Sequence, residues 1–202
     1  IISGYDSAKR ENAKSWLKNI VLMIFFVQAS FFIYDLILQF AALLTAGIVN
    51  LINKNFFLLT ADNLGSLALE LSLAIPYLAT VLFTIVLLTL RYLFVAVGII
   101  FFPIGIFFNF VAPLASYGKL IINSLLILIF LPFFQSIVLL AASKLLEVGI
   151  FDIFKIVIMI GAFFLINLMM LFLVLFAVIK AVKSVTHSTV GKVIVSGLKN
   201  LV

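Results

Sequence analysis

The sequence predicts an all-α protein, a polytopic bundle of transmembrane helices. Three observations predict this class: 66% of the 202 residues are hydrophobic, only 10% are charged, and the apolar residues form long runs. A soluble domain is about half apolar and about a quarter charged, and at this size it still exposes about a third of its surface to water. Such a domain cannot cover this much apolar surface, whereas lipid solvates it. We therefore expect one transmembrane domain over 1–202, with four spans favoured and five possible.

The chain opens with a polar segment, residues 1–16. Its basic residues, together with one at the start of the following span, are Lys9, Arg10, Lys14 and Lys18. Trp16 stands where the apolar run begins. Basic residues followed by an aromatic residue are typical of a helix that enters a bilayer from the cytoplasmic side. We expect a basic interfacial helix here, a cytoplasmic N-terminus, and a multi-pass chain in the cell membrane (inner or plasma).

Four apolar segments are the predicted spans, and a basic tail follows them. The spans are 17–49, 77–111, 120–142 and 156–179, and the tail is 180–202. As one helix, the first span would be about 50 Å long against a hydrocarbon core of about 30 Å, so it must tilt, bend or protrude. The tail interleaves Lys with Val and Leu, which favours a position on the membrane surface.

Residues 64–111 allow two interpretations, because Arg91 interrupts a nearly continuous apolar stretch. Either two spans turn near Arg91, or one long helix follows an interfacial segment. With four spans, nine basic residues lie inside and three outside, and Arg91 lies within the membrane; with five, the split is seven to six. Lys and Arg gather at cytoplasmic ends of spans, so the distribution favours four.

Polar groups inside the spans are the candidate functional residues. Gln28, Asp35 and Gln39 are spaced seven and four apart, which places them on one face of a helix. A polar stripe of this kind faces other helices or a wet cavity, since lipid cannot satisfy it. We predict an intramembrane ion pair between Asp35 and Arg91. The pair could fix helix register or line a gated conduit; alternatively, Arg91 lies at an interface.

Other in-span residues are expected to join helices. Thr84 shares the face of Arg91, together with Thr80, Gly98 and Gly105, and small residues there let a neighbouring backbone approach. Gln135 lies on one face with Ser124, and Asn109 and Asn167 add isolated amides. Such groups usually hydrogen-bond across helices. The pair Gly161–Ala162 predicts a close-packing position.

Motifs for catalysis are missing from the sequence. There is no Cys, and His187 is the only His, without metal-ligand spacing around it. Neither a nucleophile elbow nor a phosphate-binding loop is present, and no two carboxylates within the spans have the spacing of a dyad. We predict that the chain is not an enzyme and that it uses no cofactor or metal.

Two stretches carry a resemblance to a known family. AKRENAKSWLKN, followed by a span with Gln28, Ser30 and Asp35, resembles the start of the conserved region of VirB6/TrbL-like proteins. The region that begins RYLFVAVGIIFFPIGIFFNF is similar to that family's core, in which an Arg-led helix runs to a Pro. Here these residues are Arg91 and Pro103, and a second helix follows with a break at Pro132 and Gln135.

The family consists of polytopic subunits of type IV secretion and conjugation machines, with relatives in archaeal DNA import. The resemblance implies a channel or scaffold subunit of a DNA-transfer apparatus. It also implies a homo-oligomer that works with pilin-like subunits and a separate ATPase, with the transferred DNA as a further candidate partner. Two alternatives stay open: a small-solute transporter or ion channel built around Asp35 and Arg91, and a purely structural subunit of a membrane complex.

Overall fold

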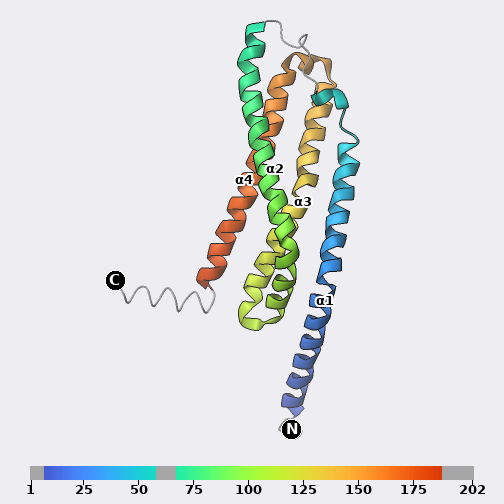
Figure 1. Ribbon diagram of the computed structural model, residues 1–202, viewed down its shortest axis with the longest axis vertical. Helices are drawn as coiled ribbons and strands as arrows, with labels where there is room; N and C mark the ends of the chain where they lie inside the picture. The colour runs from blue at the N-terminus through green and yellow to red at the C-terminus, as the bar shows by residue number, and fades with distance from the viewer. Residues whose placement is uncertain (1–6, 58–66, 188–202) are drawn as a thin grey trace, which may run out of the picture. The chain divides into compact units, whose positions relative to one another are not determined.

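A computed structural model describes residues 7–57 and 67–187 of the chain (Figure 1). Four long α-helices follow one another in this part: α1 (Ser7–Val49), α2 (Leu67–Phe110), α3 (Ala115–Leu146) and α4 (Lys155–His187). Short 3-10 turns lie between them: η2 (Lys54–Phe57), η4 (Ala112–Leu114) and η5 (Gly149–Phe154). The described residues include no strand, so the predicted all-helical class is confirmed.

Each of the four helices is long and apolar enough to cross a membrane. The qualifying stretches are Arg10–Val49, Ser72–Phe110, Ala112–Leu146 and Lys155–Phe176. Helix α2 runs without interruption through Arg91, which agrees with four spans and not with a turn at that residue. These helices are compatible with a multi-pass membrane protein.

The basic N-terminal segment is helical, as predicted, and belongs to the same helix as the apolar stretch that follows it. From Ser7 onward it forms the first turns of α1 and continues directly into the apolar stretch. No Pro or Gly lies between Ser7 and Ala46, so nothing in the local sequence ends the helix. Of the predicted basic tail, the part up to His187 continues α4, and the rest lies outside the described residues.

Two compact units make up the chain. Unit 1 comprises Ile1–Leu36, Val97–Leu126 and Ala177–Val202, and unit 2 comprises Ile37–Ala96 and Ile127–Phe176. Because every long helix passes from one unit to the other, each unit holds a part of all four helices.

Unit 1 is built around the tight connection between α2 and α3. Gly118 of α3 is buried, and a Cβ there would collide with backbone atoms of Gly105 and Asn109 in α2. The two helices therefore touch backbone to backbone, as small residues allow in membrane bundles. Tyr34 of α1 is 1% exposed and packs its ring 5.2 Å from that of Phe102.

Unit 2 has an apolar core to which the segment after α1 contributes. Ile52 and Phe56 are buried together with Met159 and Ala162 of α4. The predicted close packing therefore holds for Ala162. For Gly161 it is wrong, because a Cβ at that position would meet nothing within 4 Å.

Candidate functional site

Arg91 of α2 is held by the backbone of α3 at the position of a proline. Pro132 has no N–H, so the carbonyl of Leu128, four residues earlier, lacks its usual partner within the helix. The Nε of Arg91 donates a hydrogen bond to this Leu128 oxygen at 2.7 Å, and a terminal nitrogen lies 3.5 Å from the oxygen of Ile129. The guanidinium thus replaces the donor that proline removes.

This arrangement meets the needs of both groups. A carbonyl without a partner in apolar surroundings costs about 1–3 kcal/mol, and a guanidinium stays charged and must find acceptors. The hydrogen bond between α2 and α3 gives the Leu128 carbonyl a donor and gives the Arg91 guanidinium an acceptor. The sequence showed Arg91 and Pro132 separately, but an acceptor that is a backbone carbonyl leaves no mark in the sequence.

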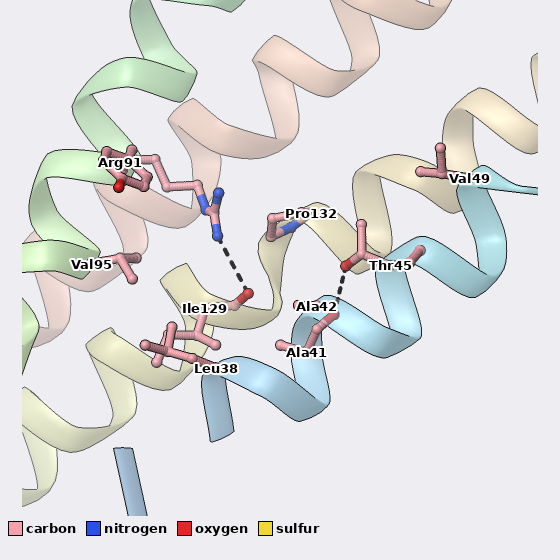
Figure 2. Close-up of a pocket in the computed structure, with 11 residues that line it drawn as sticks. Leu38, Ala41, Ala42, Thr45, Val49, Arg91, Val95, Ile129 and Pro132 are labelled. Carbon is pink, nitrogen blue, oxygen red and sulfur yellow. Dashed lines mark hydrogen bonds between the residues drawn. The ribbon is translucent and has the colours of Figure 1, made fainter. Parts of the chain in front are cut away.

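A cavity of about 500 Å³ opens beside Arg91 (Figure 2). Small residues of α1 form one wall: Ala41, Ala42, Thr45 and Ala46. Opposite them lie Val95 of α2 and Ile129 and Pro132 of α3. The hydroxyl of Thr45 already donates to the Ala41 oxygen of its own helix at 2.7 Å, so Arg91 is the one charged group in the lining.

A second polar cluster joins α2 to α4. Asn167 is 5% exposed, and its amide nitrogen donates to the Thr80 oxygen at 3.3 Å. Thr84, also buried, donates its hydroxyl to the same oxygen at 2.7 Å. The Oδ1 of Asn167 has no hydrogen-bond partner within the part of the chain that the structure describes. The side chain therefore ties α4 to α2 while leaving one acceptor unsatisfied.

Gln135 of α3 is buried and reaches α4. Its Nε2 lies 4.0 Å from the Sδ of Met170, a weak hydrogen bond. This agrees with the expectation that in-span amides act between helices.

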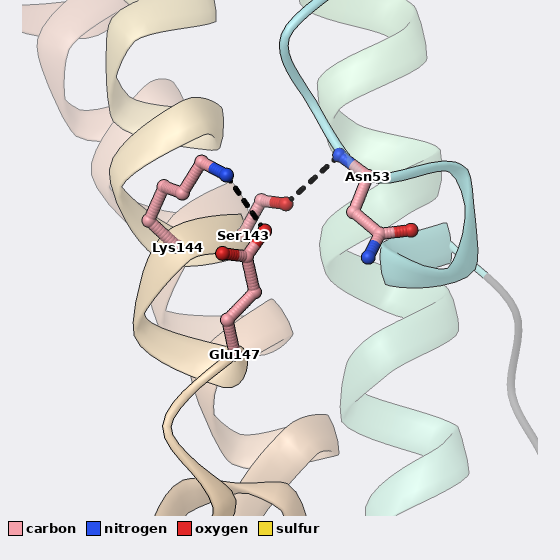
Figure 3. Close-up of polar contacts among 4 residues, drawn as sticks. All are labelled: Asn53, Ser143, Lys144 and Glu147. Atoms are coloured by element: carbon pink, nitrogen blue, oxygen red, sulfur yellow. Dashed lines mark hydrogen bonds and ion pairs between the residues drawn. The ribbon is translucent and has the colours of Figure 1, made fainter.

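The connection after α1 is fixed by a contact that the sequence did not predict (Figure 3). The backbone N–H of Asn53 donates to the hydroxyl of Ser143 at 3.1 Å, and Ser143 is 2% exposed. Beside it, Lys144 and Glu147 form an exposed ion pair at 2.7 Å, which is worth little to stability. A serine near the end of an apolar helix was the only sequence signal for this contact.

The predicted polar stripe of α1 lies on the outside of the chain. Gln28, Asp35 and Gln39 are all exposed. Ser30 and Tyr34, which project from the opposite side of the helix, are 3% and 1% exposed. Asp35 belongs to unit 1 and Arg91 to unit 2, and the ion pair between them stays a prediction.

The predicted site residues therefore fall into three places. Arg91 lines the cavity, Thr84 and Gln135 lie in the buried contacts of unit 2, and the stripe residues lie on the surface of α1. No group of three or more His, Cys, Asp or Glu side chains that could hold a metal occurs among the described residues. Comparison of the chain with protein-family models, with curated proteins and with solved structures finds no match.

Proposed function

We propose that this chain is a multi-pass subunit of the cell membrane and serves as a channel or scaffold component of a DNA-transfer apparatus. The apparatus would be of the type IV secretion, conjugation or DNA-import kind. The sequence resemblance supports the kind of apparatus, the four apolar helices support the membrane, and the exposed polar stripe supports assembly with further subunits.

Burial within the chain favours lipid around it. In the most apolar window of each helix, the buried share of residues ranges from 11% to 33%. A monomer in water would expose apolar patches far larger than the few hundred Å² that soluble proteins tolerate. Lipid, together with neighbouring subunits, covers such helices.

The observation that carries the proposal is the position of Gln28 and Asp35. Both are exposed on the side of α1 that points away from the packed Ser30 and Tyr34. Polar side chains within membrane spans face other helices or a water-filled path rather than lipid. A second copy of the chain, or a water-lined path between copies, would give this exposed polar face such surroundings. We therefore propose a homo-oligomer that assembles through this face of α1.

Single-cysteine cross-linking tests the interface directly, because the sequence contains no Cys. Gln28→Cys and Asp35→Cys should each form disulfide-linked dimers when membranes are oxidised. Leu36→Cys is the matched control: Leu36 is 69% exposed but projects 100° around the helix from Asp35. Equal cross-linking at all three positions, or at none, would contradict the proposed interface.

Genetic complementation tests the apparatus. Deletion should abolish conjugation or DNA uptake, and the unaltered chain should restore it. Asp35→Asn should restore it less well than Leu36→Ala, which changes the neighbouring surface. The role proposed is passive: pilin-like subunits and a separate ATPase would supply the moving parts, and the chain would use no cofactor. Unchanged DNA transfer after deletion would exclude this function.

The cavity beside Arg91 favours a second candidate, a small-solute transporter or ion channel. Its volume of about 500 Å³ suits a small molecule, and its single charged group is a cation. Anion flux into liposomes that is lost in Arg91→Gln would support this candidate over the first. A purely structural subunit, the third candidate, would show no flux in liposomes. DNA transfer would also continue after its deletion wherever the rest of the complex still assembles.

A further inference from the structure

A groove in unit 1 lies at the end of α1 where the apolar run begins. It has a volume of about 580 Å³. Trp16, Asn19 and Met23 line it from α1, Phe107 and Phe110 from α2, and Pro113 from the following turn η4. The α1 residues are spaced three and four apart and so share one face of the helix.

The groove is polar at one end and apolar at the other. Its two side chains with N–H donors, Trp16 and Asn19, are the lining residues of α1 nearest the polar N-terminal segment. Met23 comes later in α1, and Phe107 comes one turn before the end of α2, so both lie toward the apolar middle of their helices. Phe110 lines the groove as well, and its ring stacks on that of Phe26 with centroids 6.1 Å apart, which joins α1 to α2 beside the groove. An occupant must therefore be amphipathic, with hydrogen-bond acceptors at the level of Trp16.

Charge selects among amphipathic occupants. Among the residues that the structure describes, unit 1 contains seven basic and two acidic residues, whereas unit 2 contains four basic and three acidic ones. The groove thus opens within the unit that carries most of the net positive charge of the described residues. We propose that it binds one anionic phospholipid, with the phosphate at Trp16 and Asn19 and an acyl chain along Met23 and Phe107. This inference rests on the membrane location proposed above.

General attraction of anionic lipid to lysines would give a different pattern. Lys14 and Lys18 are exposed, and each lies two residues from Trp16, about 160° around the helix. They therefore project from the side of α1 opposite the groove. Lipid drawn by these lysines alone would gather on the wrong side of the helix, and this separates a bound lipid from a diffuse layer.

The only tryptophan of the chain is the natural probe, because Trp16 lines the groove. The protein is placed in bilayers of phosphatidylcholine that contain a minor amount of either brominated phosphatidylglycerol or brominated phosphatidylcholine. Bromine quenches tryptophan only on contact. We expect Trp16 to be quenched about threefold more by the anionic lipid than by the zwitterionic one. Asn19→Leu, which removes a donor at the groove but keeps Trp16, should reduce this preference.

The matched control moves the probe to the other side of the helix. Val21 is 59% exposed and projects about 140° away from Trp16, so the double variant Trp16→Phe, Val21→Trp reports on lipid beside Lys18. It should show little preference between the two lipids. Equal preference at both positions, or no preference at Trp16, would overturn the lipid site while leaving the membrane location intact. No quenching by either lipid would overturn the membrane location itself.

Discussion

Unit 1 joins its helices where side chains are smallest, whereas unit 2 joins them through polar side chains that reach a neighbour's backbone. In unit 1, Gly118 lies against the backbone of Gly105 and Asn109. In unit 2, Arg91 donates to α3 and Asn167 donates to α2. In the membrane location that we propose, both devices serve the same purpose, because lipid surrounds helices with apolar groups and leaves only close packing and hydrogen bonds to hold them together.

The two units also differ in charge. Unit 1, which holds the start of α1, the connection between α2 and α3, and the end of α4, carries most of the excess of basic over acidic residues. If the chain crosses a membrane four times, as we propose, the start of α1 and the connection between α2 and α3 reach the same surface. The positive-inside rule then predicts that this surface is the cytoplasmic one.

The largest effect is expected at the closest contact of unit 1. Gly118→Val places a branched side chain against the backbone of α2, which cannot move aside as a flexible side chain would. We expect a loss of at least about 3 kcal/mol in the free energy of unfolding, or failure to fold. Unfolding of the purified protein by SDS titration or heat measures it.

Gly161→Ala is the control for this substitution. It adds a Cβ in open space and should stabilise α4 by up to about 1 kcal/mol, because alanine favours helix over glycine. If the two glycine substitutions had equal effects, close backbone packing would not be what distinguishes unit 1.

A smaller but more specific effect is expected in unit 2, from coupling between Arg91 and Pro132. Arg91→Ala leaves the Leu128 carbonyl without a donor and should cost about 1–3 kcal/mol. Pro132→Ala restores the N–H that the carbonyl would otherwise use, so Arg91→Ala should cost less in that background. A double-mutant cycle on the free energy of unfolding measures the difference, for which we expect about 1 kcal/mol. Strict additivity would show that Arg91 does not act through the proline.

The smallest effect is expected at the other polar contact of unit 2. Asn167→Leu removes a hydrogen bond of 3.3 Å but also removes a buried oxygen that has no partner among the described residues. Interhelical hydrogen bonds in membrane proteins average about 0.6 kcal/mol, so the two effects should nearly cancel. We expect a change below about 1 kcal/mol in the same unfolding assay. A loss above about 2 kcal/mol would mean that this contact stabilises unit 2 more strongly than its geometry indicates.

The sequence predicted the helices well and their contacts unevenly. Long apolar runs predict helices whatever packs against them, and the charge distribution resolved the ambiguity at Arg91. Gly105 was correctly placed on a face where another helix approaches, since small residues leave a trace in the sequence. Gly161 was not, because a glycine in apolar sequence looks the same whether it faces a neighbouring helix or open space.

Contacts to backbone atoms could not be predicted in this way. The acceptor for Arg91 is a carbonyl that Pro132 leaves without a donor, and the partner of Ser143 is the N–H of Asn53. Every residue carries these backbone groups, so residue types alone do not reveal which of them meets a given side chain. The burial of Ile52 and Phe56 could not be predicted for a related reason: Asn50, Asn53 and Lys54 interrupt the apolar run there, and nothing in the residue types shows that the segment packs against α4.

Cysteine accessibility tests the proposed topology most directly: four membrane crossings, with the connection between α2 and α3 on the cytoplasmic side. Ser116→Cys places a thiol in unit 1, and Asn50→Cys places one after α1 in unit 2; both positions are exposed, and the chain has no other Cys. With a membrane-impermeant maleimide, we predict that Asn50→Cys is labelled in intact cells and that Ser116→Cys is labelled only after permeabilisation. Labelling of both from the same side would contradict the account.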